Sequence, residues 1–185
     1  MSRRYHVFTT SHYAYFVTCT IVDWQPVFAH DTYRRIVLDS LAYLREQKQT
    51  QLNAFVVMPT HLHAVLWPEV GINLYDVLRD FKRFTSRAIS KETMRSDDRQ
   101  LLEIFALARE RGRARGISQY QVWQEGSHPE AIYTLKFARQ KIEYLHNNPV
   151  RAGLAAVAEH WPYSSARAYL RGQETYPMVD LLEFD

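Results

Sequence analysis

The feature that most constrains the fold is a pair of apolar runs separated by only two residues. The first run covers residues 52–58 and ends at Pro59, and the second covers residues 61–66. Both runs are rich in β-branched and other apolar side chains, which is typical of strands. Two strands joined by so short a connection can only run antiparallel. We therefore expect an antiparallel hairpin in the middle of the chain.

The segments around this hairpin alternate between strand and helix patterns. Apolar and β-branched residues predict further strands, whereas apolar residues at a spacing of three to four predict helices. The predicted strands cover residues 13–22 and 120–124, and the predicted helices cover residues 31–49, 73–90 and 130–147, the last ended by Pro149. The resulting β-α-β-β-α-β order, followed by a helix, favours an α+β fold with one antiparallel sheet and helices packed on one face.

The length of 185 residues and the hydrophobic content of 46% suit one domain over residues 1–185. Residues 91–118 are polar and rich in arginine, and we interpret them as a basic insertion that is partly helical. Residues 154–185 form a predicted C-terminal extension. The single cysteine, Cys19, excludes an intramolecular disulfide. No stretch approaches about 20 apolar residues, so we expect a cytoplasmic protein without a membrane partner.

Two histidines on alternate residues of the second hairpin strand form a candidate metal site. His61 and His63 project to one side of the strand, while Leu62 faces the opposite layer. Neutral imidazoles at this spacing can share one Mg²⁺, Mn²⁺ or Zn²⁺ ion. The pair alone is a weak signal in a chain with eight histidines, and a purely structural role is the alternative.

A candidate nucleophile lies near the end of the last predicted helix. Tyr144 and Asn148 are four residues apart, so they share one side of that helix. A phenol is a poor nucleophile while protonated, but a metal that polarises a phosphate lowers the demand on it. The alternative is a tyrosine that anchors the helix end to the core.

A belt of basic residues crosses the middle of the chain, although the net charge is only +3. Such a belt either binds phosphates or forms a solvated helix face. The candidate DNA-contacting residues are Arg79, Lys82, Arg83, Arg87, Arg109, Arg111, Arg113 and Arg115.

Four ordered motifs closely resemble those of the REP-associated tyrosine transposases, which are IS200/IS605-like single-tyrosine transposases of the HUH endonuclease superfamily. The motifs are VMPTHLH (57–63), VWQEGSHP (122–129), EYLHNNPVRAGL (143–154) and WPYSSAR (161–167). The resemblance extends from about residue 13 to residue 172. It departs from the family at Thr60, where asparagine is more usual, and in residues 91–118, which do not align.

The resemblance implies a ferredoxin-like or RRM-like fold of the HUH single-tyrosine type. It implies that His61, His63 and Asn148 bind Mg²⁺ or Mn²⁺, and that Tyr144 attacks a phosphate of single-stranded DNA. The expected products are a 5′-phosphotyrosine and a free 3′-OH, which can react in reverse to join strands. The expected partner is a hairpin-forming palindromic repeat, whose phosphates the basic belt would contact, and the expected state is a monomer or a homodimer.

Two other functions stay open at this point. A non-catalytic RRM-like module that binds single-stranded nucleic acid would explain the aromatic residues and the basic belt. A metal hydrolase that uses activated water would cleave DNA without a covalent intermediate.

Overall fold

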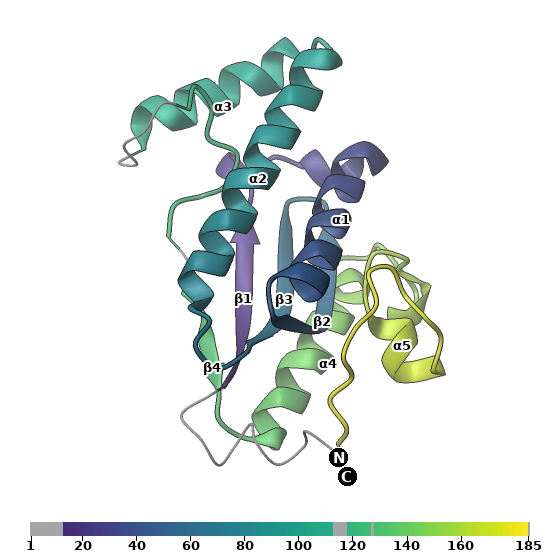
Figure 1. Ribbon diagram of the computed structural model, residues 1–185. Coiled ribbons are helices and arrows are strands. Elements are labelled where there is room, and N and C mark those ends of the chain that lie inside the picture. Colours follow the sequence, from purple (N-terminus) through teal and green to yellow (C-terminus); the bar gives the residue numbers. More distant parts are fainter. Residues whose placement is uncertain (1–12, 113–117, 127, 185) are drawn as a thin grey trace.

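The computed structural model describes residues 13–112, 118–126 and 128–184, and its centre is one antiparallel sheet (Figure 1). The strands lie in the order β2-β3-β1-β4. The predicted hairpin is confirmed, because β2 and β3 pair antiparallel around Pro59 and Thr60. The strands are β1 (Ala14–Thr20), β2 (Thr50–Met58), β3 (His61–Pro68) and β4 (Glu130–Ile132).

Helices α1 and α2 cover one face of the sheet (Figure 1). Leu41 of α1 and Phe81 of α2 are buried in one cluster with strand residues such as Phe55 and Leu62. We call this side the α1/α2 face. The helices are α1 (Asp31–Gln47), α2 (Leu74–Arg95), α3 (Arg99–Arg111), α4 (Leu135–Arg151) and α5 (Ala166–Arg171), with 3-10 turns η2 (Val22–Trp24), η3 (Val27–Ala29) and η4 (Ala158–His160).

Helix α4 packs on the opposite side of the sheet, which we call the α4 face. Ile142 and Leu145 of α4 are buried with Phe16, Val56 and Val65 in a second apolar cluster. Successive strand residues point to opposite sides, so the same strands feed both clusters. The predicted α+β fold is confirmed. Helices α1 and α2 lie on one face as expected, whereas α4 lies on the opposite face.

Three helix starts are fixed by side chains that accept a backbone hydrogen bond. Asn73 accepts from Tyr75 at the start of α2, Asp98 accepts from Leu101 at α3, and Thr134 accepts from Phe137 at α4. Each side chain satisfies one of the N–H groups that have no partner inside the helix.

The prediction of a strand at residues 120–124 was wrong. Only Trp123 of this segment forms a bridge, to Ile21, and the fourth strand is instead β4. The apolar pattern of residues 120–124 reflects burial beside α2, because the Trp123 indole N–H donates to Thr85 at 2.9 Å.

Two predicted helix boundaries were also inaccurate. Helix α4 begins at Leu135 rather than at residue 130, and it continues to Arg151 with Pro149 inside it. Helix α2 continues to Arg95, and α3 confirms that the predicted basic insertion is partly helical.

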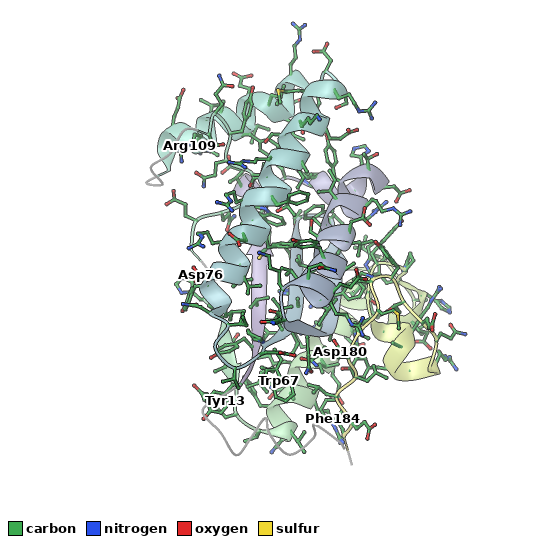
Figure 2. The ribbon with its side chains drawn as sticks, in the orientation of Figure 1. Tyr13, Trp67, Asp76, Arg109, Asp180 and Phe184 are labelled. Atoms are coloured by element: carbon green, nitrogen blue, oxygen red, sulfur yellow. The ribbon has the colours of Figure 1, made fainter. Side chains whose placement is uncertain are left out.

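The C-terminal segment runs along the free edge of β2. Backbone N–H groups of Val57, Ser165 and Asp180 donate across this edge to Tyr163, Phe55 and Leu52, at 2.8, 2.9 and 2.8 Å. The Asp180 carboxylate also accepts from Arg45 of α1 (Figure 2). These bonds occupy polar groups that an exposed sheet edge would leave unpaired.

The same segment holds α4 through a buried side-chain bond. The His146 imidazole of α4 lies 2.8 Å from the Ser165 hydroxyl, and both residues are buried. Tyr169 packs on the same imidazole, with ring centroids 5.2 Å apart. Its hydroxyl donates to the carbonyl of Asn53 at 2.9 Å. The C-terminal segment therefore links β2 to α4.

None of the helices in the described ranges combines the length and the apolar character that crossing a bilayer requires.

Candidate active site

The histidine pair lies at the start of β3, where the strand leaves the hairpin turn. The imidazole centroids of His61 and His63 are 4.7 Å apart, with their planes at 72°. His63 is buried, with 6% of its surface exposed, and His61 is half-buried. The predicted projection of the two side chains to one side of the strand is confirmed, and Leu62 is buried in the core of the α1/α2 face.

Two threonine hydroxyls hold the imidazoles by the same ring nitrogen. Thr18 Oγ1 lies 2.9 Å from Nδ1 of His63, and Thr60 Oγ1 lies 2.9 Å from Nδ1 of His61. Within the described residues, neither Nε2 atom has a hydrogen-bond partner. If each Nδ1–H donates to its threonine, each Nε2 presents a lone pair, which is the arrangement that metal-binding histidines require.

No pattern in the sequence points directly to these threonines. Thr18 lies opposite His63 in the pairing of β1 with β3, so it could have been found only once the strand register was known. Thr60 differs from the residue that is usual in the matching motif, and the motif does not indicate a role for it. The structure shows what its hydroxyl does, which is to orient His61.

Burial keeps both imidazoles uncharged near neutral pH. Loss of solvent, together with the smaller effect of positive charge at His61 and Lys141, lowers the pKa of His63 to about 3. Burial also lowers the pKa of His61. A neutral imidazole is the form that binds a metal ion.

The candidate nucleophile reaches this pair from α4. The Tyr144 ring lies 5.7 Å from the His63 ring and 6.0 Å from the Phe16 ring. Tyr144 is 41% exposed, so a ligand can approach it. The Arg151 guanidinium lies 5.7 Å from the centre of the same ring. The structure thus brings together residues that are about 80 positions apart in the sequence.

Asn148 lies one turn after Tyr144 and has its amide fixed by the helix. Its Nδ2 donates to the carbonyl of Tyr144 at 3.1 Å, so its Oδ1 is directed away from that carbonyl. Asn147 makes the same bond, at 2.9 Å to the carbonyl of Glu143. Oδ1 of Asn148 accepts no hydrogen bond from the described residues and is available as a metal ligand.

These donors fit a hard or borderline divalent cation. The imidazole nitrogens suit a borderline ion and the amide oxygen suits Mg²⁺ or Mn²⁺, and three protein donors leave open positions for phosphate oxygens. No cluster of three or more His, Cys, Asp or Glu side chains occurs in the described parts of the chain. A closed zinc site made of those residues is therefore not present there.

The basic belt divides into paired and unpaired residues. Arg79 and Arg83 of α2 form ion pairs with Asp76 and Asp80, and Lys82 donates to the carbonyl of Gly126 at 2.8 Å. Arg87 is exposed and has no partner among the described residues. Helix α2 lies on the face of the sheet opposite α4, so the structure does not bring these residues to Tyr144.

The other predicted DNA-contacting residues belong to α3 and the segment after it. Arg111 pairs with Asp23, and Arg109 lies on α3 (Figure 2). Arg113 and Arg115 lie outside the described residues.

A tryptophan beside the histidines was missed in the sequence. Trp24 lies in η2, its ring centroid is 5.7 Å from that of His61, and it is 58% exposed. The sequence placed it in a loop, where an aromatic residue has no periodic pattern to reveal its role.

Comparison with known proteins confirms the resemblance that the motifs suggested. No family model matches the chain. A protein from Haemophilus influenzae named "Putative REP-associated tyrosine transposase" is 27% identical over 125 residues, which is 67% of this chain. The matched part spans 62% of the length of that relative.

A solved structure of a REP-associated tyrosine transposase bound to a REP hairpin has the same fold. Its TM-score to this chain is 0.59, at 18% sequence identity, covering all of this chain and 95% of the other. The expected transposase-type fold is therefore confirmed.

Proposed function

We propose that this protein is a metal-dependent single-stranded DNA endonuclease and strand transferase that acts at hairpin-forming repeats. One observation carries the proposal: the Tyr144 ring lies 5.7 Å from His63, one of two neutral imidazoles held by threonines. A nucleophile beside a pair of metal ligands is the arrangement that phosphoryl transfer through a tyrosine requires. The similarity to REP-associated tyrosine transposases supports the choice of DNA as substrate.

The reaction begins with attack of the Tyr144 oxygen on the phosphorus of a DNA phosphodiester. The bond from phosphorus to the 3′ oxygen breaks, the phenol proton is lost to solvent, and the departing 3′ oxygen is protonated. The products are a 5′-phosphotyrosine and a free 3′-OH. The bond energy is kept in the phosphotyrosine, so attack by a 3′-OH can rejoin strands without an external energy source.

The chain's own residues provide the positions for this chemistry. His61, His63 and Asn148 would hold Mg²⁺ or Mn²⁺, which when bound stabilises charge on the phosphate. Thr18 and Thr60 fix the orientation of the imidazoles. Arg151, close to the Tyr144 ring, places a positive charge where a DNA phosphate would approach.

One chain contains the whole proposed site, because Tyr144 and His63 of the same chain are in ring contact. We therefore expect a monomer to be sufficient for cleavage. Mixing Tyr144→Phe with His63→Gln tests this: two inactive proteins that regain activity together would show that the tyrosine acts on a second copy.

The experiment that tests the function uses hairpin repeats taken from beside the protein's own gene, with Mn²⁺ or Mg²⁺. Each DNA is labelled at its 5′ end in one sample and at its 3′ end in another. We expect the 3′-labelled DNA to run as a covalent protein adduct on a denaturing gel, while the 5′-labelled DNA is shortened and free. The adduct should be lost with a chelator or with Tyr144→Phe.

Tyr133→Phe is the matched control, because Tyr133 is also exposed and follows β4 directly. Adducts from this variant should equal those of the unchanged protein. Cleavage that persists in Tyr144→Phe would point to a hydrolase with activated water. Tight hairpin binding with no cleavage in either metal would point to a non-catalytic binding module.

A further inference from the structure

The 3-10 turn η2 has two neighbouring residues in the left-handed region of the backbone. Asp23 has φ 49° and Trp24 has φ 54°. L-amino acids with bulky side chains rarely adopt such values, because Cβ then approaches the backbone. Residues held in this way are found where the surrounding structure fixes them, and they concentrate at ligand sites.

The surroundings of η2 fix it from three sides. The N–H of Ile21 donates to the carbonyl of Thr60, directly before His61, and the N–H of Val22 donates to Val122, both at 2.9 Å. The Arg111 guanidinium of α3 pairs with the carboxylate of Asp23. The turn is therefore anchored to the hairpin that carries the histidines and to the basic insertion.

This anchored turn presents a tryptophan to solvent beside the proposed metal ligands. The Trp24 indole meets the His61 ring nearly at right angles, at 76°, and is 58% exposed. Trp67 and Trp123 are buried, at 6% and 4% exposed, as is usual when tryptophan serves the core. Trp24 contributes little to the core, yet its backbone is held in an uncommon conformation.

We propose that Trp24 is a binding site for one unpaired nucleobase of the single strand next to the cleaved phosphate. The inference rests on the proposed function and adds a base-stacking position to it. Indole stacks on the face of any base, so Trp24 would hold the strand without reading its sequence. Stacking beside His61 would set the position of the backbone relative to Tyr144.

The proposal also gives the basic insertion a role other than phosphate contact. Arg111 is already paired with Asp23, so its main task here is to hold the turn that carries Trp24. Removing the Asp23 charge should by itself favour a DNA polyanion. Asp23→Asn weakens the anchor of the turn, so weaker DNA binding in this variant would support the anchoring role, whereas tighter binding would contradict it.

The main experiment measures binding of single-stranded hairpin DNA by Tyr144→Phe protein, which keeps the DNA intact. An abasic nucleotide is placed in turn at each unpaired position near the hairpin. With Trp24 present, we expect one abasic position to weaken binding by about tenfold. With Trp24→Ala added, the same abasic position should change binding less than about twofold, because the stacking partner is already gone.

Two further variants make the result specific. Trp24→Leu keeps an apolar side chain without a ring, and it should behave like Trp24→Ala. Tyr75→Ala is the control, because Tyr75 is 63% exposed and lies far from His61. It is at the start of α2, which follows the opposite end of β3. In this variant, the abasic nucleotide should still weaken binding by about tenfold.

The proposal would be overturned if the abasic nucleotide weakened binding equally in proteins with Trp24 and with Trp24→Ala. If unchanged protein also forms the covalent adduct, only the stacking site is lost and the proposed function stands. If the indole-dependent penalty is found and no adduct forms in any metal, the stacking site stands and the proposed chemistry fails.

Discussion

The two faces of the sheet differ in what they bury. On the α1/α2 face, strand residues such as Phe55, Leu62 and Leu66 are packed into a large apolar cluster. On the α4 face, the apolar cluster is smaller and borders two buried imidazoles, His63 and His146. The first face resembles the core of any folded domain, and the second face carries polar groups that cost stability unless they are hydrogen-bonded.

The difference shows how one strand can contribute to the core on one side and to the proposed active site on the other. In β3, Leu62 points into the apolar cluster, while His61 and His63 point to the side of Tyr144. The alternation of side chains along a strand makes this division possible. Stability and activity should therefore be separable by mutating neighbouring residues.

The largest expected effect comes from comparing Leu62→Ala with His63→Gln. Leu62→Ala should lower the free energy of unfolding by about 2–5 kcal/mol, because it leaves a cavity in the core. The remaining folded protein should still form the DNA adduct. His63→Gln should reduce adduct formation by at least about 100-fold, because it removes a proposed metal ligand. Urea denaturation measures the change in stability, and the rate of adduct formation measures the change in activity. Loss of the adduct in folded Leu62→Ala, with normal adduct formation in His63→Gln, would contradict this division of β3.

A second effect concerns the C-terminal segment that closes the α4 face. Burial raises the pKa of Tyr169 to about 12, so the folded protein keeps a proton that the unfolded chain releases near its ordinary pKa of 10. Stability should therefore fall as the pH rises from about 10 to about 12, by roughly 3 kcal/mol at most. Urea denaturation at several pH values measures this loss.

Tyr169→Phe should remove this part of the pH dependence. Tyr75→Phe, which changes an exposed tyrosine of α2, should retain it. Equal pH profiles for all three proteins would contradict a raised pKa of Tyr169 in the folded protein.

A third effect separates the two asparagines of α4. Asn148→Ala should slow adduct formation by about 10- to 100-fold, because the proposed third metal ligand is lost. Asn147→Ala removes the same kind of bond to the helix backbone and should have little effect. Adduct rates at several Mn²⁺ concentrations would distinguish weaker metal binding from general damage, and equal losses in both variants would argue against Asn148 as a ligand.

The smallest effect tests whether the α1/α2 face meets DNA. Arg87 is exposed and unpaired among the described residues, whereas Arg83 pairs with Asp80 at 3.2 Å. Arg87→Ala should lower the dependence of log affinity on log salt by about one, and Arg83→Ala should lower it by less. No change in the salt slope for either variant would place the DNA on the α4 face alone.

Much of the fold was predictable, because most strands and helices carry clear apolar patterns. The hairpin of β2 and β3 and the helices α1 and α2 were found in this way. Strand β4 was missed, because three residues that begin with an exposed glutamate give no alternating pattern. Residues 120–124 were misread, because an apolar pattern reports burial and does not reveal whether the partner is a strand or a helix.

The candidate site was predictable only in part. The spacing of His61 and His63 and of Tyr144 and Asn148 is local, so each pair was expected to share a side of its strand or helix. The approach of α4 to β3 depends on tertiary packing, which the residues alone do not specify. The position of Thr18 beside His63 depends on strand register, and the position of Trp24 beside His61 depends on loop conformation. Neither residue therefore carried a signal in the sequence.

The pairing of the C-terminal segment with β2 has a consequence for the order in which the structure is completed during synthesis. β2 is made before its backbone partners at Ser165 and Asp180. Until they emerge from the ribosome, α4 lacks the Ser165 hydroxyl that holds His146. A nascent chain that ends before Ser165 would hold α4 on the sheet through its apolar contacts without this bond. If Tyr144 acts as proposed, the site therefore reaches its final packing only after residues 163–180 have been made.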